Sequence, residues 1–384
     1  MKKFNTYEQK QDYENKFTSW AKGKSEYETL MAEYAQNYAA WTPYSKLRQY
    51  MNEGVVGSPL IAHAAGLISL EDKLLKNNTP AADLKKATDA ATANRKGFLE
   101  HEDLPSDEKI LAAVCMMFYN DIDKSQHPIG FYEALKANYG DLKDEATYKK
   151  WAHDVFSKTM ILDETKWNAF VANPDAAALQ ADPAFAFASA FVKNYNTKYA
   201  PLYTQFVNRN NELGRSYMKG IMEMNPAAVN KMYPDANFSM RVSYGNVKSY
   251  RPRDAVFYDY VCTAKGILEK YVPGDYEFDL PAKQIELLKK RDFGQYIDKT
   301  KNDLVVTFIT TNDITGGNSG SPVIDANGNL LGLAFDGNYE ALSHKIAFDK
   351  DLNRTICVDV RYVLWCIDKL GGAKNIINEL KLVK

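Results

Sequence analysis

The chain has 384 residues, of which 45% are apolar and 25% are charged, and its formal net charge is −1. This composition is typical of a globular protein, and the length suggests two domains or one domain with a large insertion. No basic block matches a nucleic-acid backbone, and no apolar run reaches the roughly 18 residues of a membrane span. We therefore expect neither a nucleic-acid partner nor a membrane partner.

The cysteines argue against a zinc-binding or disulfide-rich protein, and the amino end lacks the pattern of a secretory signal. The four cysteines are scattered, without the short spacing of a zinc site or a disulfide framework, so we expect buried thiols, no metal and no cofactor. Residues 1–17 begin with basic residues but lack the apolar segment of a secretory signal. The chain is then either cytoplasmic or a piece whose export signal lies on an upstream segment.

The glycines mark a change along the chain. Nine of the 21 glycines lie in the first 232 residues and twelve in the last 152, as expected where helices give way to strands and turns. We place the boundary near Tyr233 to Asn237. The predicted fold class is α+β, with a helical domain at residues 1–233 and a strand-rich domain at 234–384.

The first part has helical periodicity. Apolar residues recur at spacings of three and four at Tyr27, Leu30, Met31, Tyr34 and Tyr38. Ser106 should cap a second helix, with an apolar face of Ile110, Leu111, Val114, Met117 and Phe118. Asp182 and Pro183 make a capped start for a helix with Phe185, Phe187 and Phe191. We predict a helical bundle.

The second part has the period of strands. Phe238, Met240, Val242 and Tyr244 alternate with polar residues, which predicts a half-buried strand. Further strands are predicted at residues 304–310 and 355–360, with a hairpin through Asp325 to Asn329 and a closing helix at 362–370. We expect five or six strands in all.

The chemistry concentrates in the run GGNSGSP at residues 316–322, between predicted strands. A serine peptidase of the chymotrypsin type needs its hydroxyl on a tight turn, with backbone N–H groups converging on the oxyanion. Gly317 can turn and donate its N–H, Ser319 supplies the hydroxyl and a second N–H, and Gly320 allows close approach of substrate. A plain hairpin is the alternative, and the flanking strands favour the catalytic interpretation.

Three runs, at residues 235–254, 312–342 and 354–373, resemble the dipeptidyl-peptidase 7 and 11 family of bacterial serine peptidases. The resemblance is specific over about residues 235–380 and weaker in the helical part. It implies a helical lid inserted into a chymotrypsin-like double barrel, with the order His, Asp, helical insertion, Ser. It also implies a periplasmic homodimer.

The resemblance assigns roles to residues of this sequence. Ser319 would be the nucleophile, with the N–H groups of Gly317 and Ser319 as oxyanion donors. Asp336 would bind the free α-amino group of peptide substrates, although it could merely start an Asp-Gly turn. Gly337 takes the place of an arginine that lines the S1 pocket of acid-specific relatives, so we expect apolar or mixed P1 side chains. Asp313, six residues before Ser319, leaves Lys or Arg as an alternative.

The base and orienting carboxylate of the triad are missing from the expected place. In the family they come from a barrel ahead of the helical domain, and this chain opens in helical sequence, so the chain is expected to carry an incomplete barrel. His63 and His344 are weak substitutes, and His101, His127 and His153 are expected to be structural. The expected function is a serine dipeptidyl aminopeptidase, and the alternative is a catalytically incomplete fragment or peptide-binding module.

Overall fold

The computed structural model describes residues 5–76, 78–232 and 239–383. The chain divides into two compact units, Ala21–Glu223, called the helical unit, and Met1–Trp20 with Met224–Lys384, called the mixed unit. The boundary predicted at Tyr233 to Asn237 lies largely outside the described residues. The units divide at Ala21 and Glu223, so residues 5–20 belong with the carboxy-terminal part.

The helical unit is a bundle around one apolar core, in agreement with the predicted helical domain. Its α-helices are α2 (Leu30–Gln49), α3 (Pro59–Gly66), α4 (Ile68–Leu74), α5 (Ala81–Leu99), α6 (Leu104–Asp121), α7 (Phe131–Tyr139), α8 (Glu145–Lys158), α9 (Glu164–Ala172), α10 (Ala176–Ala181), α11 (Pro183–Lys198) and α12 (Ala200–Met224). Short turns of 3-10 or π type lie at Tyr50–Gly54, Val55–Gly57 and Lys124–Gln126.

Helix α11 begins as predicted. The Asp182 side chain accepts hydrogen bonds from the N–H groups of Ala184 and Phe185, both at 3.0 Å, which satisfies two donors that the first turn leaves open. Pro183 occupies the first turn, where its missing N–H is not needed. The three phenylalanines of the predicted face are buried in the bundle core, at Phe185, Phe187 and Phe191.

The other two predicted helices are only partly right. Helix α2 begins at Leu30, so Tyr27 is buried ahead of it. Helix α6 begins at Leu104, two residues before the predicted cap, and Ile110 and Met117 of its predicted apolar face are exposed. Spacing alone gives the helix but not how wide its buried stripe is, because neighbouring helices decide that.

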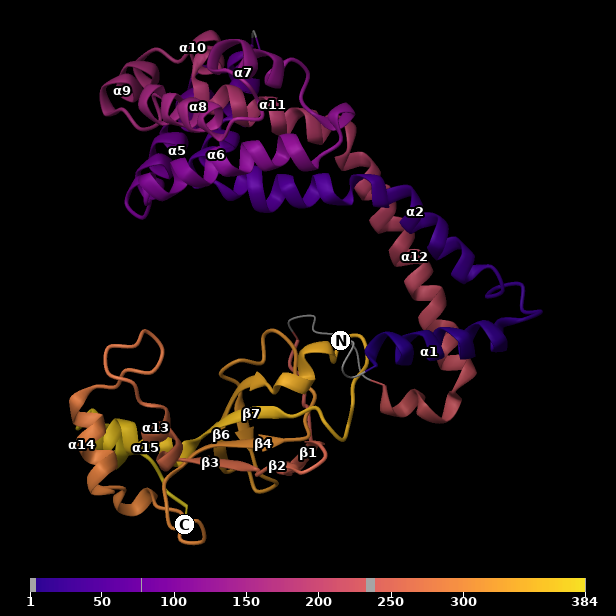
Figure 1. Ribbon diagram of the computed structural model, residues 1–384, viewed down its shortest axis with the longest axis vertical. Helices are drawn as coiled ribbons and strands as arrows, with labels where there is room; N and C mark the ends of the chain where they lie inside the picture. Colours follow the sequence, from indigo (N-terminus) through magenta and orange to yellow (C-terminus); the bar gives the residue numbers. More distant parts are fainter. Residues whose placement is uncertain (1–4, 77, 233–238, 384) are drawn as a thin grey trace. The chain divides into compact units, whose positions relative to one another are not determined.

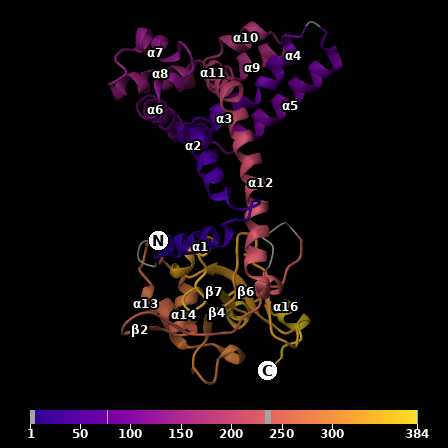
Figure 2. The same cartoon turned by 90° about the vertical axis from the view of Figure 1, so that its right-hand side faces the viewer.

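Helices α2 and α12 lie side by side in both views (Figures 1 and 2). The side chain of Asn37 donates to the Phe206 carbonyl at 3.1 Å, and the rings of Tyr38 and Phe206 meet edge to face. Among the described residues, no single helix is long and apolar enough to cross a membrane. One sharply bent pair, Leu30–Gly57 with Pro59–Leu74, meets those criteria by length and composition.

The mixed unit holds a five-stranded antiparallel sheet in the order β3-β4-β7-β6-β5 and a separate β1-β2 pair (Figure 1). The strands are β1 (Tyr250–Arg253), β2 (Val256–Tyr258), β3 (Val261–Thr263), β4 (Val305–Thr310), β5 (Pro322–Ile324), β6 (Leu330–Gly337) and β7 (Thr355–Asp359). The helices are α1 (Thr6–Ala21), α13 (Ala264–Lys270), α14 (Ala282–Lys290), α15 (Val360–Trp365) and α16 (Lys374–Glu379). Short turns lie at Pro226–Lys231, Gly294–Tyr296, Tyr339–Ser343 and Cys366–Leu370.

A small apolar cluster joins the helices of this unit to the sheet. Trp365 of α15 is fully buried with Leu288 of α14, Ala264 of α13 and Leu304 just before β4. The indole N–H of Trp365 donates to the Asp292 carbonyl at 2.8 Å, so the ring is buried without an unpaired donor. Helix α15 contacts strands β4, β6 and β7. The cluster therefore anchors the sheet at the start of β4.

Most predicted strands are confirmed. Strands β4 and β7 lie where they were expected, and the β5–β6 hairpin turns through Asp325, whose carboxylate accepts from the N–H groups of Asn327 and Asn329. The predicted closing helix occupies α15 and the π turn after it. Helices α13 and α14 were not predicted.

The strand predicted through Met240, Val242 and Tyr244 is wrong. These side chains are 96%, 84% and 89% exposed, and the segment is irregular; Phe238 lies outside the described residues. The segment lies along the end of β4, where Val247 forms a bridge with Thr310 and the Ser243 hydroxyl donates to the Asp313 carbonyl at 2.8 Å. Alternation predicts a buried face only where another layer covers it, and no described residue covers this one.

Candidate active site

The run Asn312–Ser321 forms an exposed turn between β4 and β5. Gly317 and Gly320 have φ angles of +100° and +79°, a conformation that side chains disfavour. The N–H of Asn318 donates to the Thr315 carbonyl at 3.1 Å, and the Asn318 side chain accepts from the Thr315 N–H at 3.1 Å. The chain therefore folds back on itself just before Ser319, which is exposed.

The second half of the turn is tied to the sheet. The N–H of Gly320 donates to the Ala334 carbonyl of β6 at 2.8 Å, and the Ala334 N–H donates to the Ser321 carbonyl at 2.9 Å. Within the described parts of the chain, the N–H groups of Gly317 and Ser319 and the Ser319 hydroxyl have no hydrogen-bond partner. Two amides and one hydroxyl thus remain available to a ligand on a turn held by β6.

Ser319 lines a cavity of about 470 Å³. The same cavity is lined by Asp313, Asp336, Gly337 and His344, so the predicted site residues Asp336 and Gly337 lie together with Ser319. Asp336 and Gly337 are the last two residues of β6, next to the strand pairing that holds the turn. The structure therefore unites Ser319, Asp336 and Gly337 in one site.

Asp336 is exposed, and its Oδ1 accepts a hydrogen bond from the Gly337 N–H at 2.7 Å. No described protein group donates to the other oxygen, and an exposed carboxylate of this kind can accept hydrogen bonds from an ammonium group. A Cβ at Gly337 would lie 3.2 Å from the Cβ of Ala341. A side chain at residue 337 would therefore have to displace the Tyr339–Ser343 turn slightly.

Sequence reasoning missed the contact between Asp313 and His344. Nδ1 of His344 lies 3.0 Å from Oδ1 of Asp313. The 31 residues between them include β5 and β6, and the return of the chain after β6 brings both side chains to the cavity. No described hydrogen bond joins His344 to Ser319.

The remaining histidines lie in the helical unit. Nε2 of His127 contacts the Ile122 carbonyl at 3.0 Å, and Nδ1 of His153 lies 3.2 Å from Glu108. The ring of His63 stacks on Phe98, and burial, with a smaller effect of Arg95, lowers the pKa of His63. His101 lies in the turn after α5. His127 and His153 thus have partners within the helical unit, and the structural role expected of His101 stays a prediction.

Buried polar groups hold the Tyr339–Ser343 turn beside the cavity. The Tyr250 hydroxyl donates to Glu340 at 2.8 Å, and the Asn338 side chain donates to the same carboxylate at 2.9 Å. Burial, together with the Glu340 contact, raises the pKa of Tyr250 to about 12. The Thr6 hydroxyl of α1 also donates to the Ser343 hydroxyl at 3.2 Å, so α1 is tied to this turn.

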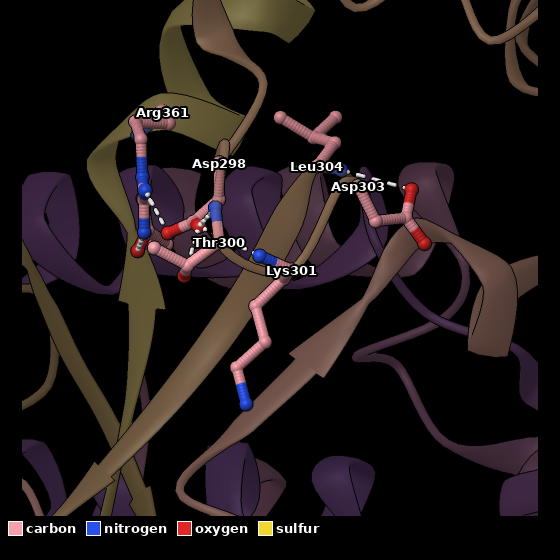
Figure 3. A network of polar contacts seen from close by, with 7 residues as sticks. Asp298, Thr300, Lys301, Asp303, Leu304 and Arg361 are labelled. Carbon is pink, nitrogen blue, oxygen red and sulfur yellow. Dashed lines mark hydrogen bonds and ion pairs between the residues drawn. The ribbon is translucent and has the colours of Figure 1, made fainter.

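A second network anchors the start of β4 (Figure 3). Asp298 accepts hydrogen bonds from the Thr300 hydroxyl at 2.6 Å, the Lys301 N–H at 3.0 Å and the Arg361 guanidinium at 2.7 Å. These contacts, the Thr300 hydroxyl first, hold the pKa of Asp298 far below its usual range. Arg361 also binds Asp359, the residue that caps α15, at 2.8 Å. The loop before β4 is thereby fixed to α15.

The chain matches the Peptidase S46 family over residues 1–382. It belongs to the peptidase S46 family. An Asp/Glu-specific dipeptidyl-peptidase of Flavobacterium psychrophilum is 36% identical over 390 residues, which cover 100% of this chain and 52% of the relative. A dipeptidyl-peptidase 7 of Capnocytophaga gingivalis is 34% identical over 388 residues, which cover 99% of this chain and 52% of the relative.

A solved structure agrees with this assignment. The crystal structure of Porphyromonas endodontalis DPP11 in complex with the dipeptide Arg-Glu has a TM-score of 0.81 at 25% identity, covering 97% of this chain and 51% of that chain. The S46 chain described here therefore spans about half the length of the relatives that it matches.

Proposed function

We propose that the protein to which this chain belongs is a serine dipeptidyl aminopeptidase, which releases dipeptides from peptides with a free amino end. The observation that carries the proposal is the position of Ser319, exposed on a glycine turn with two unpartnered amides, in one cavity with Asp336. Membership of the S46 family and the names of its relatives support the same activity.

The chemistry is acyl transfer. The Ser319 hydroxyl attacks the carbonyl of the second peptide bond, and the N–H groups of Gly317 and Ser319 hydrogen-bond to the oxyanion. The amine leaves with a proton, a dipeptidyl ester remains on Ser319, and water hydrolyses that ester. Asp336 binds the α-ammonium group, which limits the acyl part to two residues.

We propose further that the base comes from a segment outside this chain, which would complete a chymotrypsin-like barrel. Support comes from the half-length match to the relatives and from the absence, among the described contacts, of a histidine on Ser319. Export to the periplasm and a homodimer are part of the same proposal. Cell fractionation and light scattering test these two properties.

For the P1 residue, we propose apolar or mixed side chains. Gly337 contributes no cation to the cavity, so an acidic side chain lacks at this position the partner that would offset its desolvation. The relatives include both Asp/Glu-specific dipeptidyl-peptidases and dipeptidyl-peptidase 7 enzymes. A panel of P1 Leu, Lys and Glu substrates therefore tests the preference directly.

The deciding experiment measures coumarin release from dipeptidyl substrates by the complete protein. Substrates with a free amino end should be cleaved, and acetylated ones should not, because the ammonium contact with Asp336 is lost. Ser319→Ala should abolish cleavage, and Asp336→Asn should lower kcat/KM by roughly 10²-fold, about 2.7 kcal/mol for a charged hydrogen bond. Equal cleavage of acetylated substrates, or activity in the Ser319→Ala protein, would contradict the proposal.

A further inference from the structure

A second cavity lies within the helical unit, where α5 packs against α3 and α4. Its volume is about 630 Å³, which is in the range of small-molecule sites. We call it the α5 groove; its lining residues lie between Ala62 and Asn94 and come from α3, α4, α5 and Leu67. The cavity of Ser319, in contrast, is lined by residues of the mixed unit.

Small side chains keep the α5 groove open. Ala87, Ala90 and Ala91 line it from α5, and Gly66 lines it from α3. A Cβ at Gly66 would meet no atom within 4 Å, and Gly66 does not have the positive φ that requires glycine. Leu70, which is 2% exposed, adds further apolar surface to the lining. The groove therefore offers apolar contact to a ligand.

The α5 groove also has polar groups that are available to a ligand. Lys73 of α4 lines it together with Lys86 and Asn94 of α5. In the part of the chain that the structure describes, no hydrogen bond or ion pair engages these three side chains. Asp83 supplies the only carboxylate among the described lining residues. Two ammonium groups thus face one carboxylate, so the groove favours an anion over a cation.

His63 gives a second, independent sign of a binding site. It lines the groove, and its Nε2 is buried without a hydrogen-bond partner among the described residues. Burial, with a smaller effect of Arg95, lowers the pKa of His63, so the ring is neutral near pH 7. Buried polar atoms without a partner are few in folded proteins, and a bound group is one explanation for them.

The charges of the groove distinguish between classes of ligand. A neutral apolar ligand would leave both ammonium groups without a partner. A phosphate monoester carries close to two negative charges, and Asp83 opposes the second. A carboxylate with an apolar body matches both the two lysines and the alanine surface.

We propose that the α5 groove binds a small carboxylate that has an apolar body. Lys73 and Lys86 bind the carboxylate, and the alanine surface of α5 contacts the apolar part. The carboxyl end of an amino acid or peptide has this chemistry, and so has a fatty acid. The site is separate from the proposed peptidase reaction, because no step of that reaction uses these residues.

The test titrates the full chain with N-acetyl-leucine and with N-acetyl-leucinamide, followed by ligand-observed NMR. The acid should bind on the order of tenfold more tightly than the amide, the effect of a charge-assisted contact. Octanoate is titrated in parallel, and the tighter of the two acids identifies a peptide end or a fatty acid as the source. Equal Kd values for the acid and the amide overturn the inference.

Charge variants show whether the acid binds at the lysines of the groove. Lys73→Gln and Lys86→Gln should each weaken N-acetyl-leucine roughly fivefold. Lys85→Gln is the matched control and should change nothing, because Lys85 already pairs with Asp89 on the same helix. Asp83→Asn should tighten the acid roughly twofold, since it removes a repulsive charge.

A bulky side chain tests the groove independently of charge. Gly66→Leu should remove detectable binding, because the new side chain enters the open space beside α5. Gly266→Leu is the control, since Gly266 lies in α13 of the mixed unit and a Cβ there also meets no atom within 4 Å. Thermal melting followed by circular dichroism shows whether each variant is folded. Parent-like binding of the acid in folded Gly66→Leu and Lys86→Gln proteins overturns the inference.

Discussion

At the scale of single residues, the glycines of the turn make a sharp prediction. Gly317 and Gly320 have positive φ angles, and a Cβ at either would meet no atom within 4 Å. Alanine there should therefore cost about 1–2 kcal/mol through backbone strain rather than through clashes. Because the same strain shifts the amides beside Ser319, labelling of Ser319 by a fluorophosphonate should slow on the order of tenfold or more.

Gly328 supplies the control for this prediction. It has a φ of +81° and equally open surroundings, but it lies in the β5–β6 hairpin turn and not in the turn that carries Ser319. Gly328→Ala should destabilise the protein as much as the other two while leaving the labelling rate unchanged. Similar slowing in all three variants would show that labelling reports stability and not the geometry of the turn.

The sequence predicted the members of this site better than their contacts. Ser319, Gly317, Asp336 and Gly337 could be named because turn chemistry and a family motif are local signals. The contact between Asp313 and His344 could not, since it depends on how β5, β6 and the following turn fold back toward β4. No spacing rule covers such a pair.

At the scale of elements, the predictions succeeded where a local signal and a covering layer coincide. Helix α11 has its Asp182 cap and a buried face, and the β5–β6 hairpin has its Asp325 turn. The segment of Met240 and Val242 has alternating apolar and polar residues, but no described layer covers its apolar side chains, and it is irregular. Helix α14, by contrast, is short and starts without a side-chain cap, so few local signals in its sequence predict a helix.

The Asp298 network at the start of β4 predicts how the stability of β4 and α15 changes in acid. The folded-state pKa of Asp298 is depressed, so its stabilising effect is fully present above the unfolded value of about 3.9 and is lost as pH falls below it. Asp298→Asn should weaken the anchor at neutral pH by about 2 kcal/mol. Amide exchange in β4 and α15 should then be roughly 30-fold faster, as read by mass spectrometry.

The acid response gives the second half of this test. Between pH 5 and pH 2 the parent should lose protection in β4, whereas Asp298→Asn should lose less because the titrating group is gone. Glu286→Gln is the control, since Glu286 forms its described ion pair with the exposed Lys290 on α14. Equal acid sensitivity of parent and Asp298→Asn would show that another carboxylate governs this region.

At the scale of the whole molecule, one proposal explains two separate observations. Ser319 has no described histidine partner, and Met240, Val242 and Tyr244 are almost fully exposed in a segment that touches the end of β4. A further segment of the protein that packs on the sheet could bring a base to Ser319 and cover these side chains at once. Large apolar side chains in a row on a surface commonly mark such a contact.

The last prediction compares this chain with a longer product that includes any sequence encoded in frame upstream of it. If that sequence supplies the base, fluorophosphonate labelling of Ser319 should be 10²- to 10⁴-fold faster in the longer protein, the usual effect of general base catalysis. Exchange of the amides at residues 239–247 should slow in the same protein, because the exposed side chains become covered. Ser319→Ala in both forms controls for labelling elsewhere. Equal labelling rates with slowed exchange would mean that the segment covers the sheet without acting as base, whereas fast labelling of this chain alone would place the base within it.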